Sequence, residues 1–436
     1  MRVAIIGGSG EFGRLFARLF RREGHEVTIT GRDRAKGEAV ARELGVGFTT
    51  ENVAAAGAAD IVVISVYIEN TLEVIEEVAP HLRPGTLLMD VTSVKVGPCA
   101  AMARLAPEGV DVLGTHPMFG PREATFEGLT FILTPVRGTK WEGFLKDLLA
   151  REKARVVVTT PEEHDEIMAV VQGLTHFTYI SVASTLRELG VDVRRSRSFA
   201  SPIYGLMLDL IARIVGQSPR LYASIQMENP KVGKVHQAFI AQAERLKEIV
   251  ERKDMGAFAE LMAESARQMG DIEAAKGRSD KVILAMREEL RRLKEAVGRE
   301  VALKHIYSGA IHVGRVVRVE PEAVTIASER KEVTLRLSNV ELLDEAFLRQ
   351  WRRENLPRVK RDFSFLFPEG VEEGTLAEVV LAMDGRVVSC TVLDIYKGPQ
   401  IPAGMKSITL RVEAMRPEED FGKLERVLVG LGGTLR

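Results

Sequence analysis

Residues 3–13, VAIIGGSGEFG, decide the fold expected for the first part of the chain. The run VAII is short, continuous and apolar, which is typical of a buried parallel strand. Gly8, Gly10 and Gly13 follow it with the spacing G-x-G-x-x-G, and a helical pattern of apolar residues comes next. These glycines permit a tight turn, a close approach of pyrophosphate to the backbone and close packing of helix on strand. The stretch therefore predicts a Rossmann domain that binds a dinucleotide at the positive N-terminus of its first helix.

The end of the second expected strand bears on which dinucleotide is bound. This strand covers residues 26–30, and Gly31-Arg32-Asp33 follows it. NAD-dependent sites usually carry an acidic residue here, whereas an arginine accommodates the 2′-phosphate of NADP. Arg32 therefore favours NADP, with NAD as the alternative, and Asp33 either faces the ribose or opens the next helix. The cofactor-binding residues that we predict are Gly8, Ser9, Gly10, Glu11, Phe12, Gly13, Arg32, Ser65 and Val66.

Two further segments of this domain carry polar residues where a ligand is expected. Thr92, Ser93 and Lys95 follow an expected strand, at the carboxyl end where open α/β sheets bind their ligands. Residues 114–121, GTHPMFGP, place His116 on an expected loop. An unperturbed histidine has a pKa of about 6.5, so it can take the proton that an alcohol loses in a hydride-transfer reaction. The alternative is a structural loop histidine.

From Thr160 onward the pattern changes to long helices. Residues 160–163 combine a capping box with a proline at the first helical position. On this helix Gln172 and His176 are four residues apart and share a face with Asp165. The structural interpretation of the same helix is that it packs its apolar residues, Ile167, Val170, Val171 and Leu174. Later helices, near 202–216, 232–253, 256–269 and 276–298, predict a helical bundle that forms the interface of a homodimer.

Composition excludes several classes of protein. The 60 basic and 61 acidic residues give a net charge of −1, so no overall field favours nucleic acid or a membrane surface. Cys99 and Cys390 provide neither a disulfide framework nor a metal-ligand cluster, which suits a reducing compartment. The apolar strand at residue 3 leaves no room for a signal peptide, and no apolar run reaches the roughly 18 residues that span a bilayer. We expect a cytoplasmic protein with no bound metal and no membrane partner.

Several motifs, taken in order along the chain, resemble the prephenate/arogenate dehydrogenase family of tyrosine biosynthesis. They are GGSGEFG at 7–13, DVTSVK at 90–95, GTHPMFGP at 114–121, EEHDEIMAVVQGLTHF at 162–177 and the segment 212–229. The resemblance covers about residues 1–290. It implies an NAD(P)-dependent dehydrogenase that converts prephenate to 4-hydroxyphenylpyruvate by oxidative decarboxylation, with arogenate as the alternative substrate.

The resemblance also assigns roles to individual residues. His116 matches the catalytic histidine that takes the proton of the ring hydroxyl, and Ser93 matches the serine that orients it. Arg213 matches the arginine that clamps a substrate carboxylate, a task that suits a planar guanidinium. The pocket is then lined by His176 together with Gln172 on the same helix. Tyr222 stands where relatives often carry Trp, a departure at a substrate contact.

Other functions remain open at this point. Another two-domain Rossmann oxidoreductase, such as a β-hydroxyacid dehydrogenase or a deazaflavin-dependent NADP reductase, has the same architecture without this set of residues. A dinucleotide sensor or tRNA-associated protein that has lost turnover is the alternative that is not an enzyme.

The rest of the chain predicts two smaller domains. Residues 312–319, 323–326 and 332–337 are short strands separated by turn residues, typical of a small β module. The last segment has the order β-α-β-β-α-β of a ferredoxin-like α+β domain. The domains that we predict are a Rossmann domain at 1–158, an all-α helical domain at 159–300, a small β module at 301–345 and a ferredoxin-like domain at 346–436.

The last domain carries a resemblance of its own. PRVKRD at 357–362, DIYKG at 394–398 and IPAGMKS at 401–407 resemble the anticodon-binding domain of phenylalanyl-tRNA synthetase β chains. One interpretation is RNA binding through basic side chains. The residues concerned are Arg358, Lys360, Arg361, Lys397 and Lys406. The other interpretation is a regulatory or oligomerising module, which we favour because acidic residues are interspersed with the basic ones and fold does not dictate function.

Overall fold

The computed structural model describes residues 1–121, 125–138, 140–328, 331–383, 387–415 and 417–435. These residues form two compact units, 1–269 and 270–436. The first unit begins with an eight-stranded sheet in the order β3-β2-β1-β4-β5-β6-β7-β8, in which β7 runs antiparallel to β6 and the other neighbours are parallel. The strands are β1 Arg2–Ile6, β2 Glu26–Thr30, β3 Gly47–Thr49, β4 Ile61–Ile64, β5 Leu87–Asp90, β6 Asp111–Pro117, β7 Thr130–Arg137 and β8 Arg155–Val158.

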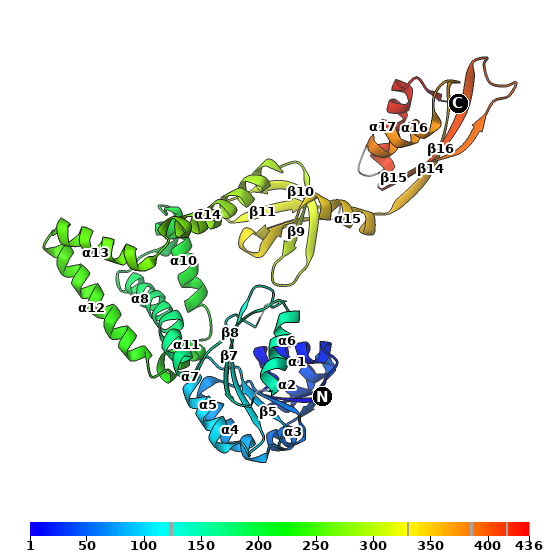
Figure 1. The fold of residues 1–436 in the computed structure, drawn as a ribbon. Coiled ribbons are helices and arrows are strands. Elements are labelled where there is room, and N and C mark those ends of the chain that lie inside the picture. The colour runs from blue at the N-terminus through cyan, green and yellow to red at the C-terminus, as the bar shows by residue number, and fades with distance from the viewer. Residues whose placement is uncertain (122–124, 139, 329–330, 384–386, 416, 436) are drawn as a thin grey trace. The chain divides into compact units, whose positions relative to one another are not determined.

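Helices cover both faces of this sheet (Figure 1). Alternate side chains of β1 belong to different cores: Val3 and Ile5 pack with α1, α2 and α6, whereas Ala4 and Ile6 pack with α3, α4 and α5. The helices are α1 Glu11–Arg22, α2 Arg34–Leu44, α3 Asn52–Ala58, α4 Ile68–Val78, α5 Val96–Leu105 and α6 Lys140–Arg151. Both faces of this strand are buried by helices, and for this reason every residue of the run VAII is apolar. The predicted Rossmann domain is confirmed.

The helical domain that follows is built around one long helix. It runs from α7 (Pro161–Met168) through a π-helical turn (Ala169–Leu174) into α8 (Thr175–Glu188). By length and composition alone this helix could cross a membrane, although the core helix of a soluble protein passes the same test. The remaining helices are α9 Val193–Arg197, α10 Pro202–Val215, α11 Pro219–Glu228, α12 Val232–Glu251 and α13 Met255–Met269.

The apolar residues of the long helix do not pack as the structural interpretation expects. Ile167, Val170 and Val171 are 46%, 51% and 46% exposed. Together they form a partly exposed apolar strip on this helix, and Ile167 and Val171 border a groove that β7 and β8 line from the other side. The interpretation in which the helix buries these side chains within its own chain is therefore wrong for all but Leu174, which is half-buried.

The second unit begins with a helix that we assigned to the helical domain. This helix, α14 (Ile272–Glu295), buries Leu293 in the core of the β module, and its Glu289 carboxylate accepts the N–H of Leu342 at 3.1 Å. An amphipathic helix can pack on either neighbour, and here the apolar side meets the sheet. The sheet has the order β12-β11-β10-β9-β13. Its strands are β9 Glu300–His305, β10 Ile311–Val319, β11 Ala323–Ala327, β12 Glu332–Arg336 and β13 Val340–Leu342.

The last part of the chain has the predicted ferredoxin-like order. After α15 (Glu345–Asn355) come β14 Arg358–Pro368, α16 Glu373–Met383, β15 Val387–Tyr396, β16 Met405–Met415, α17 Pro417–Gly430 and β17 Thr434–Leu435. The sheet order is β15-β16-β14-β17. Phe363, Phe365 and Phe367 alternate along β14 and pack beneath the two helices. The order of these elements confirms the β-α-β-β-α-β prediction. The alternation of phenylalanines marks the one sheet face that is buried.

Candidate active site

The glycine loop between β1 and α1 is shaped to accept an anion. Gly7 has φ +81°, and a Cβ on Gly13 would lie 2.4 Å from the Cα of Gly8, so neither position tolerates a side chain. Gly10 caps α1 without a side-chain hydrogen bond, and a Cβ there would meet only the carbonyl oxygen of Gly7 at 3.3 Å. The first N–H groups of α1 therefore face open space, as pyrophosphate binding requires. Phe12, in contrast, packs its side chain against the core, so only its backbone is available to a ligand.

Ser65 and Val66 line the other side of this loop. The Ser65 N–H donates to the carbonyl of Ile6 at 2.8 Å, which continues the pairing of β4 with β1. A Cβ on Gly7 would lie 2.4 Å from the Ser65 carbonyl oxygen and 2.8 Å from Val66 Cγ1. The loop, Ser65 and Val66 thus form one surface at the carboxyl end of the sheet. Glu11 is exposed in the first turn of α1, where only its backbone N–H suits an anion.

The structure separates the two roles that the sequence left open for Asp33. Its Oδ1 accepts the N–H of Lys36 at 3.0 Å, so Asp33 is the N-cap of α2. Arg32 beside it is exposed and forms no ion pair among the described residues. A Cβ on Gly31 would lie 2.7 Å from Ser9 Oγ, which brings the end of β2 next to the glycine loop. The end of β2 therefore presents a free guanidinium and no free carboxylate.

His116 lies on a strand and not on the loop that we predicted. It is the sixth residue of β6, opposite Ile132 of the antiparallel strand β7, and it is 3% exposed. Gly114 pairs with Asp90 of the parallel strand β5 on the other side. Glycine and proline in GTHPMFGP suggest a turn, but hydrogen bonding to two neighbouring strands overrides this local preference.

A buried ion pair holds the chain next to His116. The ammonium of Lys95 and the carboxylate of Asp90 are in contact, and both side chains are fully buried. Lys95 Nζ also donates to the carbonyl oxygen of Thr115 at 2.8 Å, and Asp90 accepts the N–H of Thr92 at 3.0 Å. The pair therefore ties the turn after β5 to the residue that precedes His116.

Ser93 lies in this turn. It is half-buried and makes no hydrogen bond with His116 among the described contacts. The ring nitrogen Nδ1 of His116 instead lies 2.9 Å from Nε2 of His164 on α7. The ring contact of His116 that the structure shows is therefore with His164, and the role that the resemblance implies for Ser93 stays a prediction.

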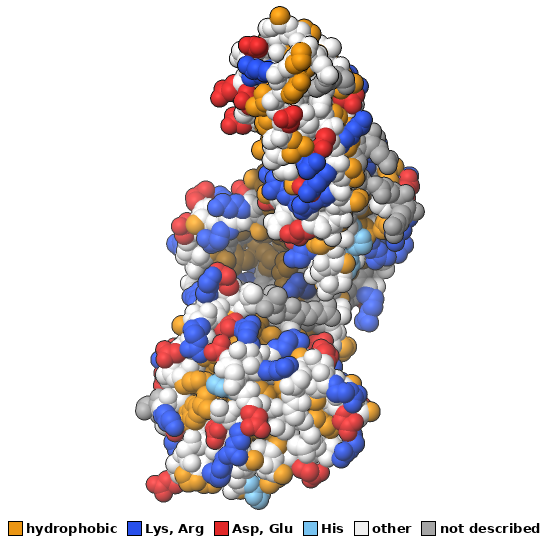
Figure 2. Space-filling view, turned by 90° about the vertical axis from the view of Figure 1, so that its right-hand side faces the viewer, with side chains coloured by type: hydrophobic (Ala, Val, Ile, Leu, Met, Phe, Trp, Pro, Cys, Tyr) orange, Lys and Arg blue, Asp and Glu red, His pale blue; other side chains and the backbone are white. Residues whose placement is uncertain are grey.

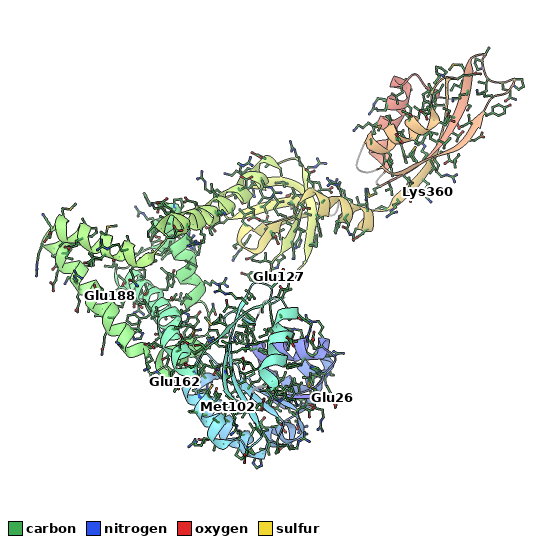
Figure 3. All side chains as sticks on the ribbon, in the orientation of Figure 1. Glu26, Met102, Glu127, Glu162, Glu188 and Lys360 are labelled. Carbon is green, nitrogen blue, oxygen red and sulfur yellow. The ribbon has the colours of Figure 1, made fainter. Side chains whose placement is uncertain are left out.

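His164 is a residue of this site that the sequence did not reveal, whereas Asp165 was already expected on the helix face of Gln172 and His176. His164 Nδ1 lies 2.8 Å from Asp165 Oδ1, and the same carboxylate accepts the N–H groups of Lys95 at 2.8 Å and Val96 at 2.9 Å. Helix α7 thus docks on the N-terminus of α5; in Figure 3, Glu162 marks the start of α7 and Met102 lies on α5. Helical spacing gave no signal for His164, because its partner His116 comes from another domain.

Burial sets the protonation of both histidines. It lowers the pKa of His116 well below the ordinary 6.5, with the charges of His164 and Lys95 acting in the same direction. It also lowers the pKa of His164, although the hydrogen bond to the carboxylate of Asp165 opposes the shift. Both imidazoles are therefore neutral near neutral pH and able to accept a proton.

Two unpartnered polar atoms lie beside this group. Gln172, on the π-helical turn, brings Nε2 to 3.4 Å from His116 Nε2. The Oε1 of Gln172 and the Nδ1 of His176 are buried and have no hydrogen-bond partner in the described structure. Buried polar atoms are nearly always paired, so these two indicate a site for a polar ligand.

The remaining predicted substrate residues gather around His176. Its ring lies 4.4 Å from that of Tyr222 on α11, and burial lowers the pKa of His176 to about 4. Burial also raises the pKa of Tyr222, while the charge of Arg213 on α10 acts in the opposite direction, so Arg213 is close to that hydroxyl. The guanidinium is exposed and can bind a carboxylate. The structure thus brings two groups together: His116 with Gln172, and His176 with Tyr222 and Arg213.

The basic residues of the ferredoxin-like domain are mostly occupied within that domain. Arg361 pairs with Glu425 at 3.7 Å, Lys397 with Glu369 at 3.6 Å and Lys406 with Glu373 at 3.0 Å. Arg358 donates to the carbonyl oxygen of Arg353, whereas Lys360 on β14 is exposed (Figure 3). On the face of the molecule shown in Figure 2, basic and acidic side chains are interspersed. Three of the five basic side chains named for this domain are therefore paired with carboxylates of the same domain.

Three family models match the chain. "Prephenate dehydrogenase, nucleotide-binding domain" matches residues 16–158, "Prephenate dehydrogenase, dimerization domain" matches 160–264, and "Ferredoxin-fold anticodon binding domain" matches 355–422. These matches agree with the order of domains described above.

Curated relatives and solved structures are also similar to the chain. A Methanocaldococcus jannaschii protein named "Probable arogenate/prephenate dehydrogenase" is 42% identical and aligns over 100% of this chain and 98% of its own length. The "4-amino-4-deoxyprephenate dehydrogenase" of Streptomyces pristinaespiralis is 35% identical over 62% of this chain and 92% of its own. The crystal structure of Aquifex aeolicus prephenate dehydrogenase with hydroxyphenyl propionate and NAD+ shares the fold of the first two domains. Its TM-score is 0.52 at 22% identity, covering 62% of this chain and 98% of that one.

Proposed function

Since the chain belongs to the prephenate dehydrogenase family, we propose that it converts prephenate to 4-hydroxyphenylpyruvate by NAD(P)-dependent oxidative decarboxylation, with arogenate as the alternative substrate. The observation that carries the proposal is the buried, neutral His116 next to the unpartnered atoms of Gln172 and His176. A base and unsatisfied polar atoms at one site are what an enzyme that oxidises a ring alcohol needs.

His116 supplies the base. Its Nε2 atom faces Gln172 and takes the hydroxyl proton as the alcohol becomes a carbonyl. The glycine loop and the start of α1 would hold a nicotinamide dinucleotide, which when bound would supply the oxidant for hydride removal. Loss of the ring carboxylate as carbon dioxide then makes the ring aromatic, which renders the overall reaction effectively irreversible.

Substrate recognition falls to the second group of residues. Prephenate carries two carboxylates, and the exposed guanidinium of Arg213 can hold one of them through two parallel hydrogen bonds. His176 is neutral at pH 7, because burial lowers its pKa to about 4, so it binds by hydrogen bonding and not by charge. Tyr222 supplies a hydroxyl next to both.

NADP is the cofactor that we favour. The free guanidinium of Arg32 is suited to the 2′-phosphate, and Asp33 is already engaged as the cap of α2. Strand β2 ends at Thr30, and only Gly31 and Arg32 stand between it and Asp33, so no other acidic residue directly follows the strand.

The test is turnover with four combinations of substrate and cofactor. Prephenate and arogenate are each offered with NADP and with NAD, and formation of the reduced nicotinamide is followed by absorbance. Turnover with either substrate supports the proposal and identifies substrate and cofactor together. Absence of turnover with all four, in folded protein that still binds a dinucleotide, contradicts it.

We also propose that the protein is a homodimer. Within the apolar strip of Ile167, Val170 and Val171, Ile167 and Val171 border a groove of about 440 Å³ that β7 and β8 line from the other side, and Val170 is 51% exposed. An exposed apolar strip of this kind suits a second copy of the same helix. Replacement of Val170 by Asp should shift the sedimentation coefficient towards that of a monomer. Unchanged sedimentation of this variant would exclude the strip from the interface.

For the ferredoxin-like domain we propose a regulatory or oligomerising role in preference to RNA binding. The ion pairs of Arg361, Lys397 and Lys406 support this choice. A salt-sensitive complex with tRNA, measured by filter binding, would contradict it.

A further inference from the structure

We propose that His164 and Asp165 are positioning residues that hold His116 in the tautomer whose Nε2 accepts the substrate proton. The inference rests on the proposed function, in which His116 is the base. It goes further by assigning a task to two residues that do not themselves touch the substrate.

The order of donors and acceptors follows from the carboxylate. Asp165 accepts the backbone N–H groups of Lys95 and Val96 through its two carboxylate oxygens, and the Nδ1 atom of His164 lies 2.8 Å from the same Oδ1. A carboxylate offers acceptors only. His164 must therefore donate from Nδ1. A neutral imidazole has one N–H, which leaves Nε2 of His164 as an acceptor.

The same reasoning continues to the base. Because His164 Nε2 accepts, the contact of 2.9 Å to His116 requires that His116 donates from Nδ1. The lone pair of His116 then resides on Nε2, where the amide of Gln172 donates at 3.4 Å. A single arrangement of protons satisfies every contact from Asp165 to Gln172. It presents the basic nitrogen on the side that holds the unpartnered atoms.

The charged groups around this chain of contacts act on it in opposite directions. Among the described residues Lys95 is the buried cation that faces the two histidines, and it lowers the pKa of both although Asp90 is in direct contact with it. Asp165 opposes this effect at His164, whose ring it contacts at 2.8 Å. When His116 takes a proton, the resulting charge lies one imidazole ring away from the carboxylate of Asp165, which stabilises it.

Asp165 also links the orientation of His164 to the packing of the helical domain against the Rossmann domain. Its Oδ1 and Oδ2 bind the first N–H groups at the start of α5, where a helix dipole favours a carboxylate. Its backbone carbonyl accepts the side-chain amide of Asn229 at 2.8 Å. If α7 moved away from α5, Asp165 would lose these donors and His164 would no longer be aligned. The base is therefore oriented only when the domains are closed on each other.

The first test observes the tautomer directly and does not depend on activity. Protein labelled with 15N-histidine is compared with the His116→Gln variant to assign the His116 ring signals. We expect a protonated Nδ1 and an unprotonated Nε2 near neutral pH. Protonation at Nε2 instead would overturn the proposal.

The second test separates positioning from general structure. His164→Leu should lower kcat by about 10²-fold with a much smaller change in KM, because substrate contacts remain. His164→Gln, whose amide can both donate and accept, should recover part of the loss. Asp165→Asn should move the acid limb of the kcat profile to lower pH, because a nearby negative charge raises the pKa of His164 and so supports proton uptake. His81→Leu, at an exposed histidine of the Rossmann domain, is the control.

The outcomes distinguish the two proposals. If the unaltered protein turns over but His164→Leu keeps kcat within about twofold, the positioning role is wrong while the proposed function stands. An acid limb that does not move in Asp165→Asn, in protein with unchanged dinucleotide binding, overturns it as well. If the unaltered protein does not turn over at all, the proposed function fails, and the 15N measurement still decides the tautomer.

Discussion

When the Lys95 ammonium is removed, the Rossmann domain should unfold at a markedly lower concentration of denaturant. Lys95 and Asp90 are both fully buried and in contact, and Lys95 also satisfies the carbonyl of Thr115. In Lys95→Met the carboxylate of Asp90 stays in the interior without a counter-charge. Breaking a buried pair from one side costs about 3–5 kcal/mol of unfolding free energy, because the desolvated charge loses its partner.

Tryptophan fluorescence can follow this domain alone. The chain has two tryptophans, and Trp141 is buried on α6 with its indole N–H donating to the carbonyl of Gly85 at 3.0 Å. In a Trp351→Phe background, urea unfolding reports Trp141 and so the Rossmann domain. The expected result is a lower midpoint with an unchanged slope, corresponding to the loss given above.

A double variant checks the physical reason. In Lys95→Met with Asp90→Asn the buried charge is gone, while an amide oxygen can still accept the N–H of Thr92. The double variant should regain part of the stability that the single variant loses. A loss below about 1 kcal/mol in Lys95→Met, or a double variant no more stable than the single one, would refute the view that an uncompensated charge dominates.

Four further results are expected. His116→Asn should lower kcat by about 10²-fold or more while dinucleotide binding persists, and near-normal turnover would remove His116 from the mechanism. Turnover needs neutral His116, so kcat is retained above its pKa and lost as the pH falls through it. Since burial places this pKa well below 6.5, the acid limb should lie below pH 6.5, and a limb above that value would contradict the assignment. Arg213→Ala should mainly raise KM, by about tenfold or more, and an unchanged KM is incompatible with a carboxylate clamp. Arg32→Ala should reduce the preference for NADP over NAD in kcat/KM, whereas an unaltered ratio would place the 2′-phosphate elsewhere.

Local pattern was sufficient where one strand or helix face is buried. The run VAII with its glycines predicted the Rossmann domain, and the alternating phenylalanines of β14 marked the buried face of the ferredoxin-like sheet. Within each of these two signals, the residues that carry it lie only a few positions apart in the sequence. These local predictions hold in the folded protein because burial of that apolar face is the main source of stability for each domain.

Local pattern failed where a contact joins distant segments. Glycine and proline around His116 suggest a loop, but pairing with β5 and β7 makes this segment a strand. His164 contacts a residue 48 positions away in another domain, so helical spacing cannot reveal it. The packing of α14 on the β module is a similar case, because an amphipathic helix does not specify which apolar surface it meets.

The π-helical turn at residues 169–174 sets the rotational phase of everything beyond it. Eight residues separate His164 from Gln172, and at about 100° per residue a regular α-helix would leave them about 80° apart around the axis. A wider turn advances less per residue, which reduces this difference and lets both side chains reach His116. The extra residue of the π-helical turn thus sets the angle at which the following side chains leave the helix. Its deletion would restore a regular α-helix and rotate Gln172 and His176 away from His116, so that the protein would fold with a misaligned site.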